Sequence, residues 1–408
     1  MKRCNWLLCL LGSAWCSSAA LAQDVELHAY IDGRLVAAPD ETSWTKGGLG
    51  KTRFGGGGTD AQFGGAAVVG TAQLTSALLA LAEIQLQTTD RPTVSVIEAY
   101  LRYRPVSLNR WRWSMQAGAF LPPISLENDA IGWTSPWTLT PSAINSWVGE
   151  ELHAVGAEGR LEWRGEVNTW ELRSALFRRN DPAGNLLAVR GWSLSDLTSG
   201  LGSRLREPDA TAGGDGDGDQ STARRYDPFQ NIGSRMGWYA NLEWHAPGLG
   251  RVRLMRYDNR ADPAAHTASG VFAWHTWFTS MGASTDTGPI HWIAQAMDGA
   301  TVIEPGYDNQ FRTGFRSAFL LAGWNRGHWR PALRVEHFST HKGRSDAGIP
   351  QGEHGNAVTA ALNWRPRDWL RLTAEVLRID SASTQRARLG LSSKSTITQA
   401  QLSVRLIY

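Results

Sequence analysis

Cysteine is almost absent from this 408-residue chain, and its three cysteines all lie within the first 16 residues. That segment belongs to a stretch of 22 residues with the composition of a secretory signal peptide. It carries basic residues, then an apolar run, then small residues, in the order Lys2, Arg3, Trp6 to Trp15 and Ala20-Leu21-Ala22. We expect cleavage after Ala22, which leaves a mature chain without cysteine. Disulfide bonds and cysteine chemistry are thereby excluded from the mature protein.

Cys16 leaves one alternative open. A lipid-modified cysteine also follows an apolar run, so the chain could be a lipoprotein. The position before such a cysteine normally holds a small residue, whereas Trp15 stands there. Cleavage after Ala22 is therefore the favoured interpretation.

The mature chain also lacks a net charge and a long apolar run. Without Lys2 and Arg3 it has 39 basic and 38 acidic residues, a formal net charge of +1, so no bulk charge attracts it to nucleic acid. Past the signal, no apolar stretch approaches the roughly 18 residues that a transmembrane helix requires. The abundant features are 43 glycines, 20 tryptophans and many short segments in which polar and apolar residues alternate.

Strict alternation begins with the mature chain. Val25, Leu27, Ala29 and Ile31 would share one face of a strand, and the other face would carry Glu26, His28, Tyr30, Asp32 and Arg34. A helix would mix these two sets. The pattern returns at 111–119, 170–176, 238–244 and 370–376, and in each segment the charged residues share one parity.

Sixteen such segments are long enough to cross a bilayer as tilted strands, which need about 9 to 11 residues. An even number places both ends of a bacterial barrel in the periplasm. The alternation is poor in 61–75, 271–283 and 314–325. The expected strands are 25–35, 61–75, 79–88, 94–104, 111–120, 152–163, 169–178, 236–246, 251–259, 271–283, 289–298, 314–325, 329–339, 356–365, 369–379 and 397–408.

The connections alternate between short and long, with one exception at 89–93. Short periplasmic turns and long extracellular loops are typical of outer-membrane barrels. The expected long loops are 36–60, 121–151, 179–235, 260–270, 299–313, 340–355 and 380–396. Tryptophans flank the short turns, as expected for an interfacial aromatic girdle: Trp111, Trp163, Trp170, Trp244, Trp324, Trp329, Trp364 and Trp369.

The sequence thus predicts one all-β domain over residues 23–408, a transmembrane antiparallel barrel of about 16 strands in the bacterial outer membrane. A secreted sandwich or propeller would explain the alternation, but not the one-sided loop lengths. The last strand, which ends at Tyr408, resembles the terminal signal that the barrel assembly machinery reads. Its apolar set faces lipid, so Gln399, Gln401, Ser403 and Arg405 would face water.

A barrel of this size leaves an aqueous channel, which points to a porin. Charges on the lumen wall would select the solutes that pass, with a mild preference for anions. Cross-strand pairing that only stabilises the wall is the alternative for each of them. The pore-lining candidates are Arg102, Arg112, Arg160, Arg173, Arg253, Arg330, Arg334, Arg371, Arg405, Glu98, Glu158, Glu162, Glu171, Glu243, Glu336 and Glu375.

The segment from Leu121 to Glu151 is the candidate constriction loop. It is rich in tryptophan, and the stretch from Thr140 to Asn145 could cap a short helix. This much apolar surface should pack against something, either the lumen wall or the barrel mouth. The residues expected to line the constriction are Pro122, Pro123, Ser125, Glu127 and Asn128.

The stretch Gly118-Ala119-Phe120-Leu121-Pro122-Pro123-Ile124-Ser125-Leu126-Glu127-Asn128 resembles the strand-to-loop segment of phosphate-selective, O/P-type porins. The resemblance implies a trimeric 16-stranded barrel with a loop folded into the channel and arginines that guide anions. That family also uses lysine, and here the chain departs from it. Its five lysines all lie outside the predicted strands: Lys2, Lys46, Lys51, Lys342 and Lys394.

Other functions have weaker support. A barrel lipase or protease needs a catalytic constellation, and the chain has neither a G-x-S-x-G nor an H-E-x-x-H motif. Chance placement in a polar lumen explains His153, His245, His275 and His337. A closed-pore receptor or adhesin remains an alternative. We expect no cofactor. The expected partners are small hydrophilic or anionic solutes, membrane lipids and lipopolysaccharide, without nucleic acid.

The run Asp215-Gly216-Asp217-Gly218-Asp219 resembles the start of a calcium loop. An EF-hand would need Gly at the sixth position and Glu at the twelfth, where Gln220 and Tyr226 stand. We therefore predict no metal site and interpret the run as a mobile surface loop, with weak surface calcium binding as the alternative.

The signal peptide can be tested directly. The mature protein, isolated from an outer-membrane fraction, is expected to begin at Gln23 when its terminal peptide is sequenced by mass spectrometry. A lipid-modified chain that begins at Cys16 would instead establish the lipoprotein.

Overall fold

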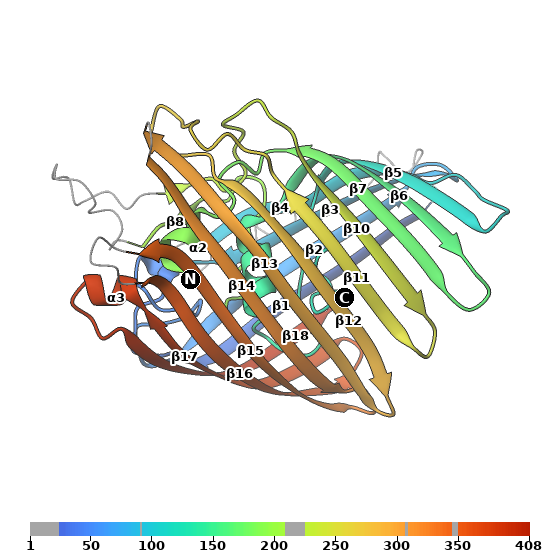
Figure 1. The fold of residues 1–408 in the computed structure, drawn as a ribbon. Coiled ribbons are helices and arrows are strands. Elements are labelled where there is room, and N and C mark those ends of the chain that lie inside the picture. The colour runs from blue at the N-terminus through green and yellow to red at the C-terminus, as the bar shows by residue number, and fades with distance from the viewer. Residues whose placement is uncertain (1–23, 90–91, 209–224, 307–308, 345–349) are drawn as a thin grey trace, which may run out of the picture.

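The computed structural model describes residues 24–89, 92–208, 225–306, 309–344 and 350–408. The predicted signal peptide and the run Asp215 to Asp219 lie outside these ranges. Within them, 16 antiparallel strands form a closed barrel (Figure 1), which confirms the predicted fold class and strand count. The barrel strands are β1 (Asp24–Ala37), β2 (Thr59–Gln73), β3 (Leu78–Thr88), β4 (Pro92–Tyr103), β5 (Trp111–Phe120), β6 (Ala154–Arg164), β7 (Thr169–Arg178), β10 (Gly237–Ala246), β11 (Gly250–Asp258), β12 (His275–Thr287), β13 (Ile290–Gly306), β14 (Asn309–Trp324), β15 (Trp329–Arg344), β16 (Pro350–Arg367), β17 (Leu370–Ser383) and β18 (Lys394–Ile407).

The first and last strands close the barrel. β1 pairs with β18 from Tyr30 opposite Ile407 to Ala37 opposite Ala400. Ala29 and Tyr408 exchange two backbone hydrogen bonds of 2.9 and 2.8 Å. Because lipid offers no hydrogen bonds, an open sheet edge inside a bilayer would leave costly unpaired groups, and the seam removes them.

The predicted parity of the strands is confirmed on both faces. In β18, Leu402 and Val404 are about half exposed on the outer face, whereas Gln401, Ser403 and Arg405 are buried inside. The interfacial tryptophans also line up. Trp111, Trp163, Trp170 and Trp244 are opposite one another on neighbouring strands, and the rings of Trp329 and Trp364 stack at 5.4 Å.

Bulges explain part of the poor alternation. The register of β2 against β1 shifts at Gly64, so the inward and outward positions exchange along β2. In β14 the cause differs, because Phe315, Phe319 and Leu321 face inward and are buried in an apolar core inside the barrel. The expected strand at 271–283 starts only at His275, since residues 271–274 continue the preceding loop.

The strands from β13 to β18 are longer on the extracellular side than predicted. Most of the expected loops 299–313 and 340–355 belongs to strands, and the expected loop 380–396 is reduced to a connection around the helix α3 (Thr384–Arg388). The alternation disappears there because the outer face becomes polar, with exposed Asp298–Arg316 and Arg378–Asp380 ion pairs. The prediction that no lysine lies in a strand was therefore wrong for Lys342 in β15 and Lys394 in β18.

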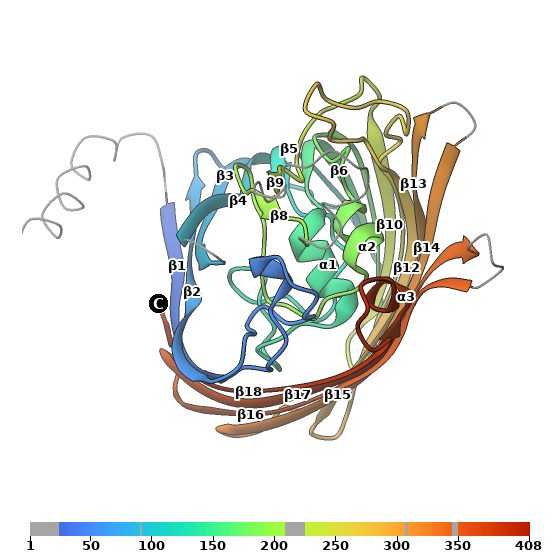
Figure 2. The ribbon, with the colours of Figure 1, turned by 90° about the vertical axis from the view of Figure 1, so that its left-hand side faces the viewer.

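Three loops fold into the barrel rather than over it (Figure 2). They contain the 3-10 helix η1 (Trp44–Lys46), the helix α1 (Ala143–Glu151), the helix α2 (Asn185–Arg190) and the short pair β8 (Leu205–Arg206) and β9 (Arg225–Tyr226). Trp147 of α1 contacts the rings of Phe278 and Phe315 at centroid distances of 5.5 and 5.0 Å. Among the described residues, no helix has the length and apolarity to span a membrane.

The outer face of the strands is apolar where it contacts lipid. The free-energy cost of a charge on this face should therefore depend on its height in the membrane. Leu320→Arg places a cation on the outer face of β14, four residues from Trp324 and near the middle of the apolar band, and we expect it to lower the free energy of unfolding by about 2–4 kcal/mol. Thr396→Arg, opposite Asp380 at the extracellular edge, is the matched control and should cost little. Urea titration of both variants in lipid vesicles measures the difference, and equal losses would contradict the assigned band.

Candidate functional site

Residues 121–151, most of the connection between β5 and β6, cross the interior of the barrel and are called the lumen loop below. The sequence expectation of a helix near Thr140 is confirmed, because the Ser142 side chain accepts the Asn145 N–H at 3.3 Å and caps α1. Every residue of α1 is buried. The hydroxyl of Ser125 accepts the N–H groups of Glu127 and Asn128 at 3.1 and 2.7 Å and forms a tight turn just after the two prolines.

Arg334 of β15 fastens the lumen loop to the wall. Its guanidinium is completely buried and lies 2.5 Å from a carboxylate oxygen of Glu127 and 2.9 Å from Glu336. It also donates to the backbone oxygens of Thr140 and Pro141 at 2.8 and 3.0 Å. A buried cation is tolerated when it is paired and fully hydrogen-bonded, and these bonds meet that condition.

Other predicted pore charges contact the same loop. On the wall near Arg334, Glu336 accepts the Ala143 N–H at 2.7 Å, and Glu375 accepts the Leu139 N–H at 2.5 Å. Three further arginines donate to oxygens of the lumen loop: Arg371 to Ser135, Arg405 to Thr134, and Arg253 to Pro123 and Ser125. These side chains position the loop, and their charges are largely withdrawn from water.

Except for Arg330 of β15, the remaining candidates lie on the strands β4 to β7 and β10. Arg102 donates to Gln116 and to the Tyr100 hydroxyl at 2.9 and 2.8 Å. Arg112, four residues before Gln116 on β5, is half-buried and lies opposite Glu162 of β6. Glu98 accepts the Leu121 N–H, Glu158 accepts the Tyr239 hydroxyl, and Arg173 pairs with Glu171.

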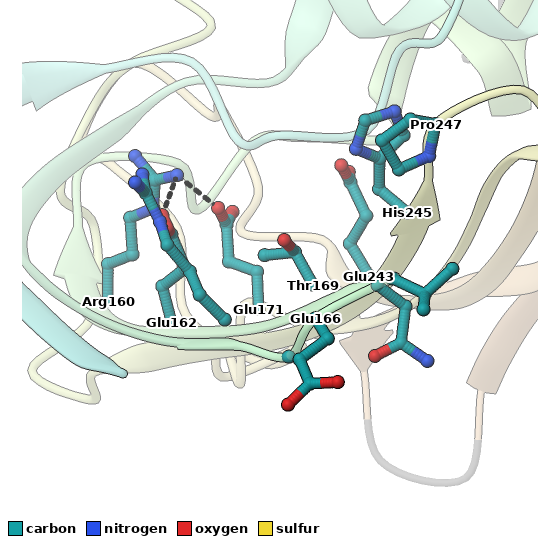
Figure 3. Close-up of a pocket in the computed structure, with 12 residues that line it drawn as sticks. Arg160, Glu162, Glu166, Thr169, Glu171, Glu243, His245 and Pro247 are labelled. Carbon is teal, nitrogen blue, oxygen red and sulfur yellow. Dashed lines mark hydrogen bonds and ion pairs between the residues drawn. The ribbon is translucent and has the colours of Figure 1, made fainter. Parts of the chain in front are cut away.

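A hollow of about 420 Å³ opens on this wall near the periplasmic turns. Figure 3 shows Arg160 between Glu162 and Glu171, with Glu243 and His245 across the hollow. The side chain of Arg160 is 32% exposed and lies 3.0 Å from Glu162, so it is paired and still in contact with water. Glu166 adds a further carboxylate at the rim. Carboxylates therefore outnumber guanidinium groups in the hollow.

Arginines gather on the opposite wall. The inward positions near the periplasmic ends of β15 to β18 hold Arg330, Arg365, Arg371 and Arg405. In the order of strands around the barrel, β17 lies eight places from β7. We call these four residues the basic wall, and we call Glu162, Glu171 and Glu243 the acidic wall. The two walls lie on opposite sides of the barrel at similar depth. The lumen loop covers part of the basic wall, and each acid of the acidic wall is ion-paired with an arginine.

Two further loops inside the barrel were not predicted as part of the site. Asp196, from the long loop after β7, lies 2.7 Å from Arg34 of β1 and 3.3 Å from Arg53 of the loop after β1. Burial raises the pKa of Asp196, but the two guanidinium groups outweigh burial and hold that pKa below its usual value. The lumen parity of Arg34 and Asp32 was visible in the sequence, although neither was named as a candidate.

The four histidines expected in the lumen do not share one place. His245 lines the hollow on the acidic wall. His153 is buried, which lowers the pKa of its imidazole to about 4. His275 and His337 have outward parity, so their placement in the lumen was wrong. Within the described ranges, no group of three or more His, Cys, Asp or Glu residues has the geometry to hold a metal ion.

Solved bacterial outer-membrane proteins share this fold. The outer membrane channel DcaP of Acinetobacter baumannii has a TM-score of 0.54 at 12% identity, over 94% of this chain and 97% of that chain. OmpF of Salmonella typhi, in complex with daunomycin, has a TM-score of 0.52 at 11% identity, with the same two coverages. In-vitro folded OmpT of Vibrio cholerae, in its trimer form, has a TM-score of 0.50 at 10% identity over 94% and 99%.

No family model and no curated protein sequence matches the chain. At these identities the likeness shows the fold alone. The closed antiparallel barrel, its apolar outer band and these similar structures show a β-barrel of the bacterial outer membrane.

The buried pair of Glu127 and Arg334 can be tested in isolation. Glu127→Gln leaves Arg334 with one carboxylate fewer, and we expect a loss of about 3 kcal/mol in the free energy of unfolding. We also expect proteolysis to cut the lumen loop in the folded barrel. Glu166→Gln removes an exposed partner of Arg110 at a periplasmic turn and is the control. If both variants resist the protease equally, the pair does not hold the loop.

Proposed function

We propose that the protein is a porin, a passive diffusion channel for small hydrophilic solutes with a mild preference for anions. The observation that carries the proposal is the pair of opposed charge clusters, the acidic wall on β6, β7 and β10 and the basic wall on β15 to β18. A barrel that only anchors a surface domain has no need of opposed charges across its lumen. The likeness to a solved outer-membrane channel favours transport over catalysis.

The two walls would act through a transverse field. A polar solute that crosses the lumen between them can align its dipole with that field, which compensates part of its lost hydration. Arg112, Arg160 and Arg173 keep contact with water on the wall opposite to the basic wall. Arg160 and Arg173 are paired with Glu171, whereas Arg112 has no ion-pair partner among the described residues. The mild anion preference is proposed on the ground of Arg112 and of the half-buried Arg330 and Arg365 of the basic wall.

The proposed partners are further copies of this chain, the barrel assembly machinery and the lipids of the outer membrane. The resemblance of residues 118–128 to O/P-type porins supports a homotrimer, as does the fold shared with a barrel whose structure is a trimer. The last strand, with its outward apolar residues, is proposed as the segment that the barrel assembly machinery reads. The outer band would contact membrane lipids and lipopolysaccharide.

A receptor or adhesin with a closed pore is the second candidate. The specific observation in its favour is the apolar core inside the barrel, where Trp147, Trp192 and Phe315 are completely or almost completely buried. Such packing narrows the extracellular half of the lumen.

Planar-bilayer recording decides between the two candidates. Refolded mature protein is expected to give steady conductance steps, because the inner wall keeps a hollow open to water near the periplasmic turns, lined by Arg160, Glu171 and Glu243, which we propose as part of the path. A barrel that inserts without conductance would exclude the porin and favour the receptor.

Reversal potentials in a salt gradient test the selectivity. Arg112→Ala and Arg173→Ala together should shift the reversal potential toward cation preference, because both remove positive charge from the open wall. Arg378→Ala, on the exposed outer face, is the matched control and should leave it unchanged. A cation preference of the unmodified protein would contradict the proposed selectivity.

A further inference from the structure

The outer wall of the barrel carries a hollow lined by basic residues, outside the lumen. It has a volume of about 600 Å³, within the range of small-ligand sites. Gly314 of β14 forms its floor, since a Cβ added there would meet only backbone oxygens at 3.8 and 3.9 Å. Arg312 and Arg316 have the same outward parity as Gly314 and stand on either side of it along the strand. Ser339 and His341 of β15 form one side.

The height of the hollow in the membrane follows from the girdle. Trp324, at the periplasmic end of β14, is eight residues from Arg316 and twelve from Arg312. A strand that rises about 3.4 Å per residue with a tilt of about 40° places Arg316 roughly 21 Å and Arg312 roughly 31 Å above that tryptophan. The apolar band of such barrels is about 25 Å tall. The hollow therefore straddles the outer edge of the band, at the level of outer-leaflet headgroups.

The charges of the hollow favour an anion. Arg312, Arg316 and Lys342 line it together with one carboxylate, Asp298, which pairs with Arg316. Within the part of the chain that the structure describes, Arg312 has no ion-pair partner, and its guanidinium lies 5.6 Å from the ring centroid of Trp277. An arginine that stacks on an interfacial tryptophan is held in place for a bidentate bond to phosphate.

We propose that this hollow binds a phosphate group of lipopolysaccharide, with Arg312 and Arg316 on the phosphate and the acyl chains running down the apolar band below. Two cations at the level of the headgroups supply the attraction, and the missing side chain at Gly314 supplies the space. The inference rests on the proposed contact with lipopolysaccharide but not on conductance.

Native mass spectrometry of the refolded mature protein with bis-phosphorylated lipid A tests the site. The double variant Arg312→Ala/Arg316→Ala should bind at least about tenfold more weakly, because each basic residue near a charged lipid surface contributes about 1 kcal/mol. Gly314→Leu, which covers the floor of the hollow and removes no charge, should weaken binding as well. Arg378→Ala, an exposed outward arginine on β17 outside the hollow, should bind as the unmodified protein does.

Three results would overturn the proposal. One is unchanged affinity of the double variant or of Gly314→Leu. Another is equal affinity for lipid A from which both phosphates have been removed, which would show that acyl chains alone bind. The third is equally tight binding of inorganic phosphate without lipid, which would make this a site for free phosphate. Conductance of the variants should stay as in the unmodified protein, so failure here is separable from failure of the porin.

Discussion

The closure of the backbone hydrogen bonds inside lipid is the constraint on which the rest of this structure depends. A sheet edge cannot remain open in a bilayer, so β1 must pair with β18, and every strand between them has one face toward lipid and one toward the interior. The outer face has to be apolar over the thickness of the membrane. The inner face has no such requirement, and all of the chemistry of this protein lies there or above the apolar band.

The interior of the barrel is partly filled by loops. Three loops enter it and bring buried charges with them, and several of these charges are neutralised by a partner on the wall or on another loop. Arg334 with Glu127 and Asp196 with Arg34 are such pairs. The lumen is therefore divided into a packed part and a part with charges in contact with water, on the strands β4 to β7 and β10.

Most of the fold was predictable from the sequence because, in strands that contact lipid, every second residue has to be apolar. The alternation is lost on the extracellular side of Asp298 and Arg378, where the strands no longer contact lipid. The extracellular ends of six strands were therefore interpreted as loops. The alternation is also lost in β14, where Phe319 faces an apolar loop and not water.

The site was predictable only in part. Arg160 and Arg334 have the same sequence pattern, a cation at an inward position of a strand. One contacts water and the other is buried against Glu127, which is 207 residues away in the chain. A local sequence pattern cannot show that an arginine contacts a residue so far away in the chain. That residues 121–151 pack against another surface was predictable, because a loop rich in tryptophan has to bury its apolar side chains. That Glu127 and Asn128 are buried in this packing was not predictable from the segment alone.

The bonds between the lumen loop and the wall imply an order of assembly. The loop precedes β15 and β17 in the chain, yet Glu336 and Glu375 accept hydrogen bonds from its backbone at separations of 193 and 236 residues. If the sheet curled first and the loop entered later, Glu375 would lack these donors and Glu336 would keep only its bond to Arg334. We therefore expect the lumen loop to be in place when β15 and β17 close the barrel, because its backbone completes the hydrogen bonds of both carboxylates.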